Sequence, residues 1–333
     1  NNHMTTTLEQ AKNQFLDMIG NSRKKRTKIQ YETALRSLWA LFSGDFDLKP
    51  SKTPVNEISE IAPDLFKNFI ALLNDSKAPS TTQVYTTAAI SFFEFLNTEG
   101  LTTINLERCE NYRKRARRSG QRIPSYPEEE ILKVIGYAED LALKQTEDQR
   151  NRLINLRDRA FIVVLADSGL RVHEACNLKR GDLNANTGKA VIIGKGDKEA
   201  IIRFSERSMT YIADYLAARR LLDGNNPGKR LDGLPLFARH DPAGHKKTLP
   251  VSTTTGRKIV DRAVASVLGL EALGSITPHS FRHYFVTTVL RGSGGNLKLA
   301  QELARHSNIS TTSIYSHLVD DELQREYDDI FNS

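Results

Sequence analysis

The chain has 333 residues, more than one hydrophobic core usually serves, so we expect two domains. Its composition, 39% hydrophobic and 26% charged, is that of an ordinary globular protein and excludes a disordered or fibrous chain. The 47 Lys and Arg exceed the 40 Asp and Glu by 7, and this net charge of +7 indicates a polyanionic partner.

The sequence contains neither a membrane-spanning pattern nor a secretion signal. No run approaches the length of apolar residues that a membrane helix needs, and the first residues are polar. The two cysteines, Cys109 and Cys176, give no disulfide framework and no Cys-x-x-Cys zinc pair. We therefore expect a cytoplasmic protein with no membrane partner.

Helical periodicity dominates the first domain, which we place at residues 4–118. Apolar stripes at helical spacing fall within residues 15–19, 31–42, 65–73 and 84–96. The last of these helices is expected to start at Pro79 and to end at Gly100. The pattern predicts about four helices, with Phe92, Phe93 and Phe95 in their core and not stacked on bases.

A linker at residues 119–127, rich in charge and Pro, separates this domain from a second one at residues 128–333. Glu128 to Glu130 follow Pro127 as a helix start, and residues 159–166 form a strongly apolar helix. Two β-branched runs, 190–194 and 200–204, predict a hairpin, and helical patterns return at 209–222 and 255–268. The fold class is therefore mainly α with a small antiparallel β-sheet.

Basic residues cluster on either side of the first domain, as expected of a surface that tracks phosphates, although solvated helix faces would give the same pattern. The residues that we assign to polyanion binding are Arg23, Lys24, Lys25, Arg26, Lys28, Arg113, Lys114, Arg115, Arg117, Arg118, Arg257 and Lys258. Ser80, Thr81, Thr82 and Gln83 open a helix, where they would either read bases in a major groove or cap the helix.

Two segments of the second domain bear cations at helix starts. Thr277 and Pro278 open a helix that carries His279 and Arg282 three residues apart, an arrangement suited to clamping an anion or to an ordinary surface pair. Arg171 follows the helix break at Gly169, and Glu174 is placed to pair with it.

Three further residues, Lys195, His306 and Tyr315, indicate a function only in combination with the other motifs. Lys195 lies on the predicted hairpin turn, where it would reach a ligand or simply solubilise the turn. Tyr315 follows His306 by nine residues, and a lone tyrosine there is usually a packing residue. The glycines around Lys195 do not match a nucleotide-binding loop, and His279 with His283 lacks the Glu of a zinc protease helix, so we expect no cofactor and no metal.

These motifs, taken together, resemble the tyrosine recombinase (phage integrase) family. The resemblance rests on Gly-Leu-Arg171-x-x-Glu, Gly-Lys195-Gly-x-Lys, His279-x-x-Arg282, His306-Ser and Tyr315, which occur in the order and spacing of that family. The likeness extends over nearly the whole chain, whose length resembles the two-domain Xer-like and Cre-like recombinases. One departure is Arg305, where the family commonly has Gly, and we expect it to alter the backbone at His306 or to add a DNA contact.

The resemblance implies a site-specific DNA recombinase with a helical core-binding domain and a catalytic domain. Tyr315 would attack the scissile phosphate to give a 3′-phosphotyrosine, and Arg171 and Arg282 would clamp the phosphate oxygens. His279 and His306 would donate hydrogen bonds to the phosphate, and Lys195 would be the general acid. Glu174 is assigned to structural support of Arg171. Strand exchange would pass through a Holliday junction without ATP.

The implied partner is a double-stranded DNA recombination site, bound at the nucleoid by a tetramer. A C-terminal helix at about 320–333 has an apolar stripe that would pack on its own domain or, as the resemblance implies, dock on a neighbouring protomer. An accessory or partner recombinase is compatible with this assembly. A type IB topoisomerase-like enzyme and a catalytically silent DNA-binding protein are the alternatives. Chromosome dimer resolution, mobile-element integration or excision and plasmid resolution all fit the prediction.

Overall fold

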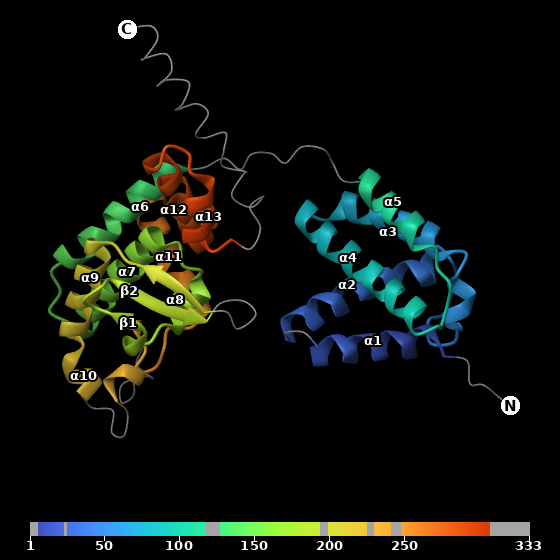
Figure 1. Cartoon of the computed structure of the whole chain (residues 1–333), viewed down its shortest axis with the longest axis horizontal. Coiled ribbons are helices and arrows are strands. Elements are labelled where there is room, and N and C mark those ends of the chain that lie inside the picture. Colours follow the sequence, from blue (N-terminus) through green and yellow to red (C-terminus); the bar gives the residue numbers. More distant parts are fainter. Residues whose placement is uncertain are drawn as a thin grey trace, which may run out of the picture. The chain divides into compact units, whose positions relative to one another are not determined.

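The computed structural model describes residues 6–22, 25–116, 127–193, 199–224, 230–240 and 248–306. The chain divides into two compact units, residues 1–122 and 123–333 (Figure 1). The fold is mainly helical with one small antiparallel sheet, which confirms the predicted fold class. None of the described helices is long and apolar enough to cross a membrane.

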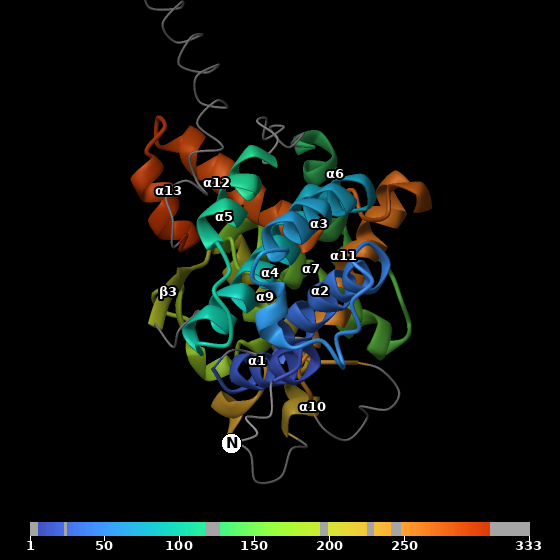
Figure 2. The same ribbon diagram turned by 90° about the vertical axis from the view of Figure 1, so that its right-hand side faces the viewer.

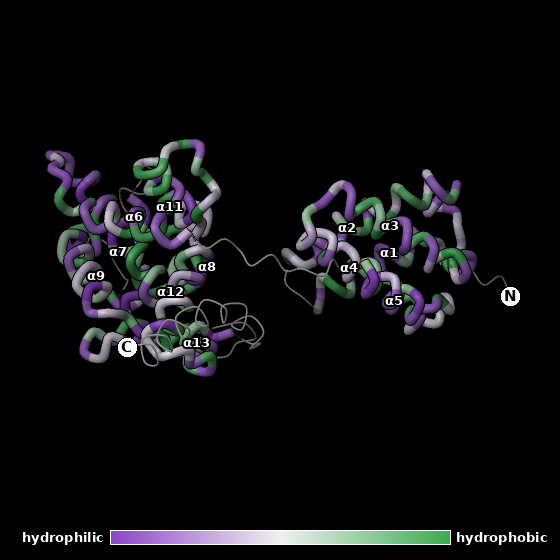
Figure 3. Tube along the Cα trace, turned by 90° about the horizontal axis from the view of Figure 1, so that it is seen from above, coloured by the Kyte–Doolittle hydropathy of each residue, from purple (hydrophilic) through white to green (hydrophobic). Residues whose placement is uncertain are grey.

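The first unit is entirely helical in its described part. It contains α1 (Leu8–Ser22), α2 (Lys25–Gly44), α3 (Ala62–Ser76), α4 (Pro79–Thr98), α5 (Leu106–Ala116) and a short 3-10 helix, η1 (Val55–Ile58). The four expected helices are present, and α5 adds a fifth that the apolar pattern did not predict. Along each helix hydrophobic and hydrophilic residues alternate, as Figure 3 shows, because one face of an amphipathic helix turns to the core.

The core of the first unit is aromatic. Phe92 and Phe93 are fully buried and Phe95 packs against the same cluster, so their prediction as core residues is confirmed. The helix that bears them, α4, begins at Pro79 as expected, and Gly100 adopts a left-handed backbone (φ +67°) just after it ends.

The capping alternative for residues 80–83 is wrong. The residue that caps α4 is Ala78, and its side chain accepts no backbone hydrogen bond. Pro79 suits the first helical position because it has no N–H and its φ is fixed, and the N–H of Thr81 donates to the Ala78 carbonyl at 2.9 Å instead of to a capping side chain. Ser80 and Gln83 are instead exposed to solvent.

The second unit surrounds one buried helix. In α7 (Gln149–Ser168) the seven residues from Ala160 to Ala166 are at most 1% exposed. Three helices, α6 (Glu128–Asp140), α9 (Glu206–Ala218) and α12 (Pro278–Gly292), pack against α7. Because α7 is covered on several sides, it is apolar all round in this stretch and shows little amphipathic period.

The sheet of the second unit has the strand order β1-β2-β3, with both pairings antiparallel. Its strands are β1 (Leu183–Asn184), β2 (Lys189–Ile193) and β3 (Glu199–Arg203), and Val191 lies opposite Ile201. The predicted hairpin is therefore confirmed, each strand beginning and ending one residue earlier than expected. The strand β1 was not predicted, because two residues carry no alternation.

Further helices complete the second unit, and the ends of some of them carry candidate site residues. They include α8 (Val172–Asn177), α10 (Arg220–Gly224), α11 (Thr253–Leu268) and α13 (Leu297–Ala304), with 3-10 turns η2 (Leu141–Leu143), η3 (Arg180–Asp182), η4 (Leu231–Gly233) and η6 (Leu270–Ala272). Helices α12 and α13 lie side by side in Figures 1 and 2 and pack on each other. The turn between α7 and α8, the start of α12 and the end of α13 carry the predicted catalytic residues that the structure describes, Arg171, His279, Arg282 and His306.

Candidate active site

Arg171 stands at the N-terminus of α8, where the chain turns sharply. Gly169 ends α7 in the left-handed region (φ +60°), and two residues later Arg171 becomes the N-cap of α8. Its backbone N–H donates to Glu174 Oε2 at 2.8 Å, and its Nη1 donates to Oε1 at 2.9 Å. The expected pairing of Glu174 with Arg171 is therefore present, and both carboxylate oxygens take part in it.

Glu174 is a buried carboxylate, with 7% of its surface exposed. Burial by itself raises the pKa of Glu174, but the charge of Arg305 and the hydrogen bonds from Arg171 outweigh it and hold the pKa below its usual value. The group is therefore ionised at neutral pH and provides one negative charge between arginines.

Arg282 is nearly completely buried, with 2% exposed, and it ties three elements together. From α12 its Nη1 donates to the Gly169 carbonyl at 2.5 Å, and its Nη2 donates to the Ala304 carbonyl at the end of α13. Burial, followed by the charges of Arg171 and Arg305, lowers the pKa of Arg282 to about 9. The guanidinium stays charged at pH 7, and these two hydrogen bonds use two of its five N–H donors.

Three histidines adjoin these arginines. His279 and His283 lie one turn apart on α12 with ring centroids 4.4 Å apart, and His306 follows α13. Partial burial and then the charge of Arg282 lower the pKa of His279. Burial and nearby positive charge lower the pKa of His283 and of His306 to about 4. At pH 7 these imidazoles are neutral, so each offers one N–H donor and one acceptor nitrogen.

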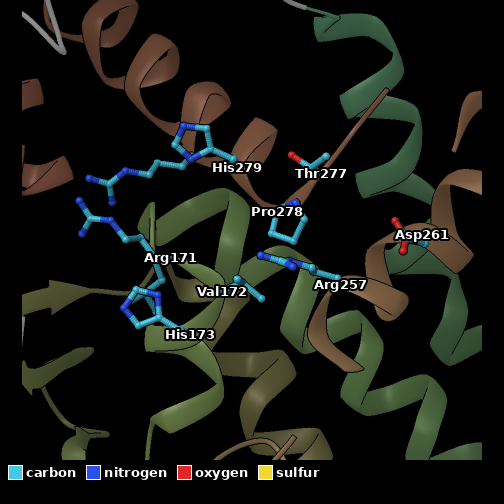
Figure 4. A pocket seen from close by; sticks show the side chains of 10 residues that line it. Arg171, Val172, His173, Arg257, Asp261, Thr277, Pro278 and His279 are labelled. Carbon is cyan, nitrogen blue, oxygen red and sulfur yellow. The ribbon is translucent and has the colours of Figure 1, made fainter. Parts of the chain in front are cut away.

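A surface pocket opens between α8, α11 and α12 (Figure 4). Arg171 and His279 project from α8 and α12 at one end of it, and Asp261 of α11 lies at the other end. The wall also includes Arg257 and Arg282. A Cβ on Gly256 would lie 2.9 Å from Val172 Cγ2, so only glycine lets α11 approach α8 this closely.

The charge around Glu174 is unbalanced. Arg171 and Arg305 hydrogen-bond to this carboxylate and Arg282 lies close enough to feel its charge, so these four described groups together carry a net charge of two positive units. Mutual repulsion of neighbouring cations is relieved by an anion with several acceptor oxygens, such as a phosphate diester. In the described part of the chain, no three His, Cys, Asp or Glu side chains come together as metal ligands.

The structure brings together four of the six catalytic candidates: Arg171, His279, Arg282 and His306. The other two, Lys195 and Tyr315, lie outside the described residues, as does the expected C-terminal helix at 320–333. From the sequence, His283 was weighed only as a metal ligand. Its spacing of four residues from His279 places both on one face of a helix, and this spacing was the signal that His283 also lies beside the site. Arg305 is also near the site, through its contact with Glu174.

Some of the polyanion-binding candidates are exposed to solvent, and others form ion pairs within the protein. Lys114 and Arg115 at the end of α5 are exposed, as are Arg257 and Lys258 of α11. Arg113 instead pairs with Glu110 at 2.8 Å, and Lys28 pairs with Asp17 at 2.9 Å. The remaining candidates lie outside the description, four of them entirely (Arg23, Lys24, Arg117, Arg118) and two in their side chains (Lys25, Arg26).

Comparison with known proteins gives concordant matches. The model of the phage integrase family matches residues 137–322. Tyrosine recombinase XerC of Thermodesulfovibrio yellowstonii is 30% identical over 264 residues, 79% of each chain. Tyrosine recombinase XerD of Rickettsia conorii is 30% identical over 323 residues, covering 94% of this chain and 95% of the relative.

Solved structures share the fold over nearly the full length. XerH site-specific recombinase bound to its difH substrate superposes with a TM-score of 0.66 at 19% identity, covering 97% of this chain and 84% of that one. A lambda integrase dimer bound to a COC′ core site superposes with a TM-score of 0.61 at 17% identity, covering 93% and 95%.

The relatives carry the recombinase name, and the family model spans more than half of the chain. The prediction of a site-specific tyrosine recombinase is thereby confirmed. On this evidence the chain belongs to the phage integrase family and is a tyrosine recombinase of the Xer-like kind.

Proposed function

We propose that this recombinase cuts and rejoins DNA at a specific site through a 3′-phosphotyrosine on Tyr315 and a Holliday junction, without ATP or metal. The observation that carries the proposal is the cluster of Arg171, Arg282 and Arg305 near the carboxylate of Glu174, in which Arg171 and Arg282 line a surface pocket. Such an excess of guanidinium groups suits a phosphate diester, whose non-bridging oxygens accept paired N–H donors.

The reaction is a pair of transesterifications at phosphorus. The phenolate oxygen of Tyr315 attacks, the P–O5′ bond breaks, and Lys195 gives its proton to the leaving 5′-oxygen. Attack by the 5′-hydroxyl of another strand then reverses these steps and frees Tyr315. Since a phosphodiester-level bond persists throughout, no external energy source is required.

The described residues would act on the phosphate and on the tyrosine proton. Arg171 is partly exposed at the pocket and Arg282 also lines it, so both guanidinium groups suit the charge that builds on the oxygens. A neutral His279 is able to accept the proton of Tyr315, while His306 donates to a phosphate oxygen. Bound phosphate would raise the pKa of both histidines by favouring their charged forms.

The two units would grip the duplex together, residues 4–118 as the core-binding domain and 128–333 as the catalytic domain, joined by the linker at 119–127. The exposed Lys114 and Arg115 on one unit, and Arg257 and Lys258 on the other, suit phosphate contacts. Ser80 and Gln83, exposed at the start of α4, suit base contacts in a groove. A tetramer joined through residues 320–333 would synapse two DNA sites at the nucleoid.

A covalent capture experiment tests this function without knowledge of the site. The protein is incubated, with EDTA and without ATP, with duplexes that carry a random core and a nick, so that the cleaved strand diffuses away. Adducts that survive SDS are isolated and their DNA sequenced. We expect wild type to enrich one sequence and Tyr315→Phe to give no adduct. Adducts with Tyr315→Phe, or none with wild type while the duplex is bound, would overturn the proposal.

The enriched site then separates recombination from simple nicking. Two plasmid-borne copies are expected to give exchanged products and a resolvable Holliday junction. Relaxation of supercoiled plasmid without exchanged products would instead point to a topoisomerase-like activity.

A further inference from the structure

Arg305 occupies a backbone position that favours glycine. It caps the C-terminus of α13 with φ +56° and ψ +46°, in the left-handed region that side chains with a Cβ rarely adopt. Among the described residues, Asp47 is the one other residue besides glycines with positive φ. Asp tolerates this region better than most residues because its short polar side chain bonds locally, and Arg has no such advantage.

The side chain of Arg305 turns inward to the site. Only 12% of it is exposed, and its Nη2 donates to Glu174 Oε2 at 3.0 Å and to the Gly169 carbonyl at 3.3 Å. Each of these acceptors also receives an arginine that we assign to the phosphate. Glu174 Oε2 accepts the backbone N–H of Arg171, and the Gly169 carbonyl accepts Nη1 of Arg282. One nitrogen of Arg305 thus joins the two acceptors that hold Arg171 and Arg282.

The contacts of Arg305 are not explained by a contribution to the stability of the fold. The backbone of Arg305 is strained, and its Nε and Nη1 are buried without an acceptor among the described residues. Glu174 would keep hydrogen bonds on both oxygens without Arg305, because Arg171 supplies them. Strain and unsatisfied donors that persist beside a site point to a role in the site.

We propose that Arg305 is a positioning residue for cleavage, which locks Arg171 and Arg282 to each other and to the end of α13 that leads into His306. The proposal rests on the function proposed above. It assigns Arg305 a role through Glu174 and Gly169, and no contact with DNA.

The test compares Arg305→Gly and Arg305→Lys with a matched control, Asp47→Gly. Asp47 is exposed and also has positive φ, so its change to Gly relieves the same kind of strain away from the pocket. We expect Arg305→Gly to unfold at the wild-type temperature or above it and to bind duplex with unchanged affinity, while it forms the covalent adduct roughly 10- to 100-fold more slowly at saturating DNA. Arg305→Lys should form the adduct faster than Arg305→Gly but more slowly than wild type. Asp47→Gly should form the adduct at the wild-type rate.

A double-mutant cycle with Glu174→Gln tests the route of the effect. If Arg305 acts through Glu174, adding Arg305→Gly to Glu174→Gln should slow cleavage by less than about 2-fold more. A wild-type cleavage rate in Arg305→Gly would overturn the proposal, as would a loss of DNA affinity with no loss of cleavage rate. Additive effects of the two substitutions in the cycle would also overturn it, and so would a loss of cleavage that matches the fraction of unfolded protein.

A readout without DNA separates this proposal from the recombinase reaction itself. The charged groups around Glu174 are Arg171, Arg282 and Arg305, and the depressed pKa of Glu174 adds stability above its unfolded value that is lost as the pH falls. Removing Arg305 raises that pKa, so the unfolding temperature of Arg305→Gly should fall less than that of wild type between neutral pH and about pH 3.5. An equal fall would overturn the contact, even if wild type formed no adduct.

Discussion

Arg282 and Gly169 are 113 positions apart in the sequence, yet Nη1 of Arg282 donates to the Gly169 carbonyl at 2.5 Å. The same guanidinium donates to the carbonyl of Ala304, so one side chain of α12 connects the end of α7 with the end of α13. Carbonyls at helix ends lack intrahelical partners, and a buried arginine satisfies them while its own charge is held near them. The residues proposed to bind phosphate therefore also hold the site together.

Gly169→Ala should lower stability by more than its backbone cost. The residue has φ +60°, and an added Cβ would lie 2.5 Å from Phe285 Cδ1, so strain and overpacking combine. We expect the free energy of unfolding in urea to fall by about 2–4 kcal/mol. Gly294→Ala is the control, since it has φ +59° in the same unit and nothing within 4 Å of its Cβ; it should lose about 1 kcal/mol. Equal losses would exclude the contact with Phe285.

Gly256→Ala should disturb the pocket from α11. The Cβ would meet Val172, Phe161 and Cys176 at 2.9–3.1 Å, so α11 must move away from α8 at a cost of about 1–3 kcal/mol. The control is Gly136→Ala in α6, where nothing lies within 4 Å, and there alanine should add about 1 kcal/mol by helix propensity alone. Urea unfolding measures both, and a stabilised Gly256→Ala would contradict the close packing.

Acid should destabilise the second unit through its histidines. The pKa values of His283 and His306 are lowered to about 4 by burial and then by nearby positive charge, whereas the unfolded chain binds these protons near pH 6.5. Stability is thus fully present above pH 6.5 and is lost as the pH falls toward 4. NMR titration of the imidazole protons checks the values, with His306→Asn identifying one resonance. A titration of that resonance near pH 6.5 would contradict the burial of the ring.

The same titration in the presence of a cleavable duplex tests the phosphate assignment. We expect the His306 resonance to titrate at higher pH in complexes of Tyr315→Phe with the enriched duplex, because the phosphate favours imidazolium. An unchanged value would place His306 away from the phosphate.

Arg282→Lys should lose cleavage although it keeps the charge. Lysine has three donors on one nitrogen and cannot reach the carbonyls of Gly169 and Ala304 together with a phosphate. We expect covalent adduct to form about 100-fold more slowly or worse, with duplex affinity little changed. Arg230→Lys, at a side chain that is 91% exposed, is the control and should cleave like wild type. Near-normal cleavage by Arg282→Lys would show that charge alone suffices.

Local sequence signals predicted most of the helices and strands, but they missed elements whose structure depends on contacts with other parts of the chain. Pro79, Pro127 and Pro278 marked helix starts correctly because proline restricts its own φ wherever it stands. The helix α5 was missed, since its strongly charged sequence offers Cys109 as its one buried residue and its helical state depends on packing against α3 and α4. The strand β1 was missed because its two residues gain their structure from β2.

The sequence by itself determined the family, the six candidate catalytic positions and the fold class, because motif spacing and hydrophobic periodicity are properties of the linear chain. Only the tertiary structure decided that Arg282 is buried on two carbonyls, that Glu174 serves Arg171 and Arg305 together, and that Arg305 takes a glycine-like backbone. Hydrogen bonds across 113 or 131 positions arise from how α7, α8, α12 and α13 pack, and no local pattern encodes which donors and acceptors that packing brings within reach.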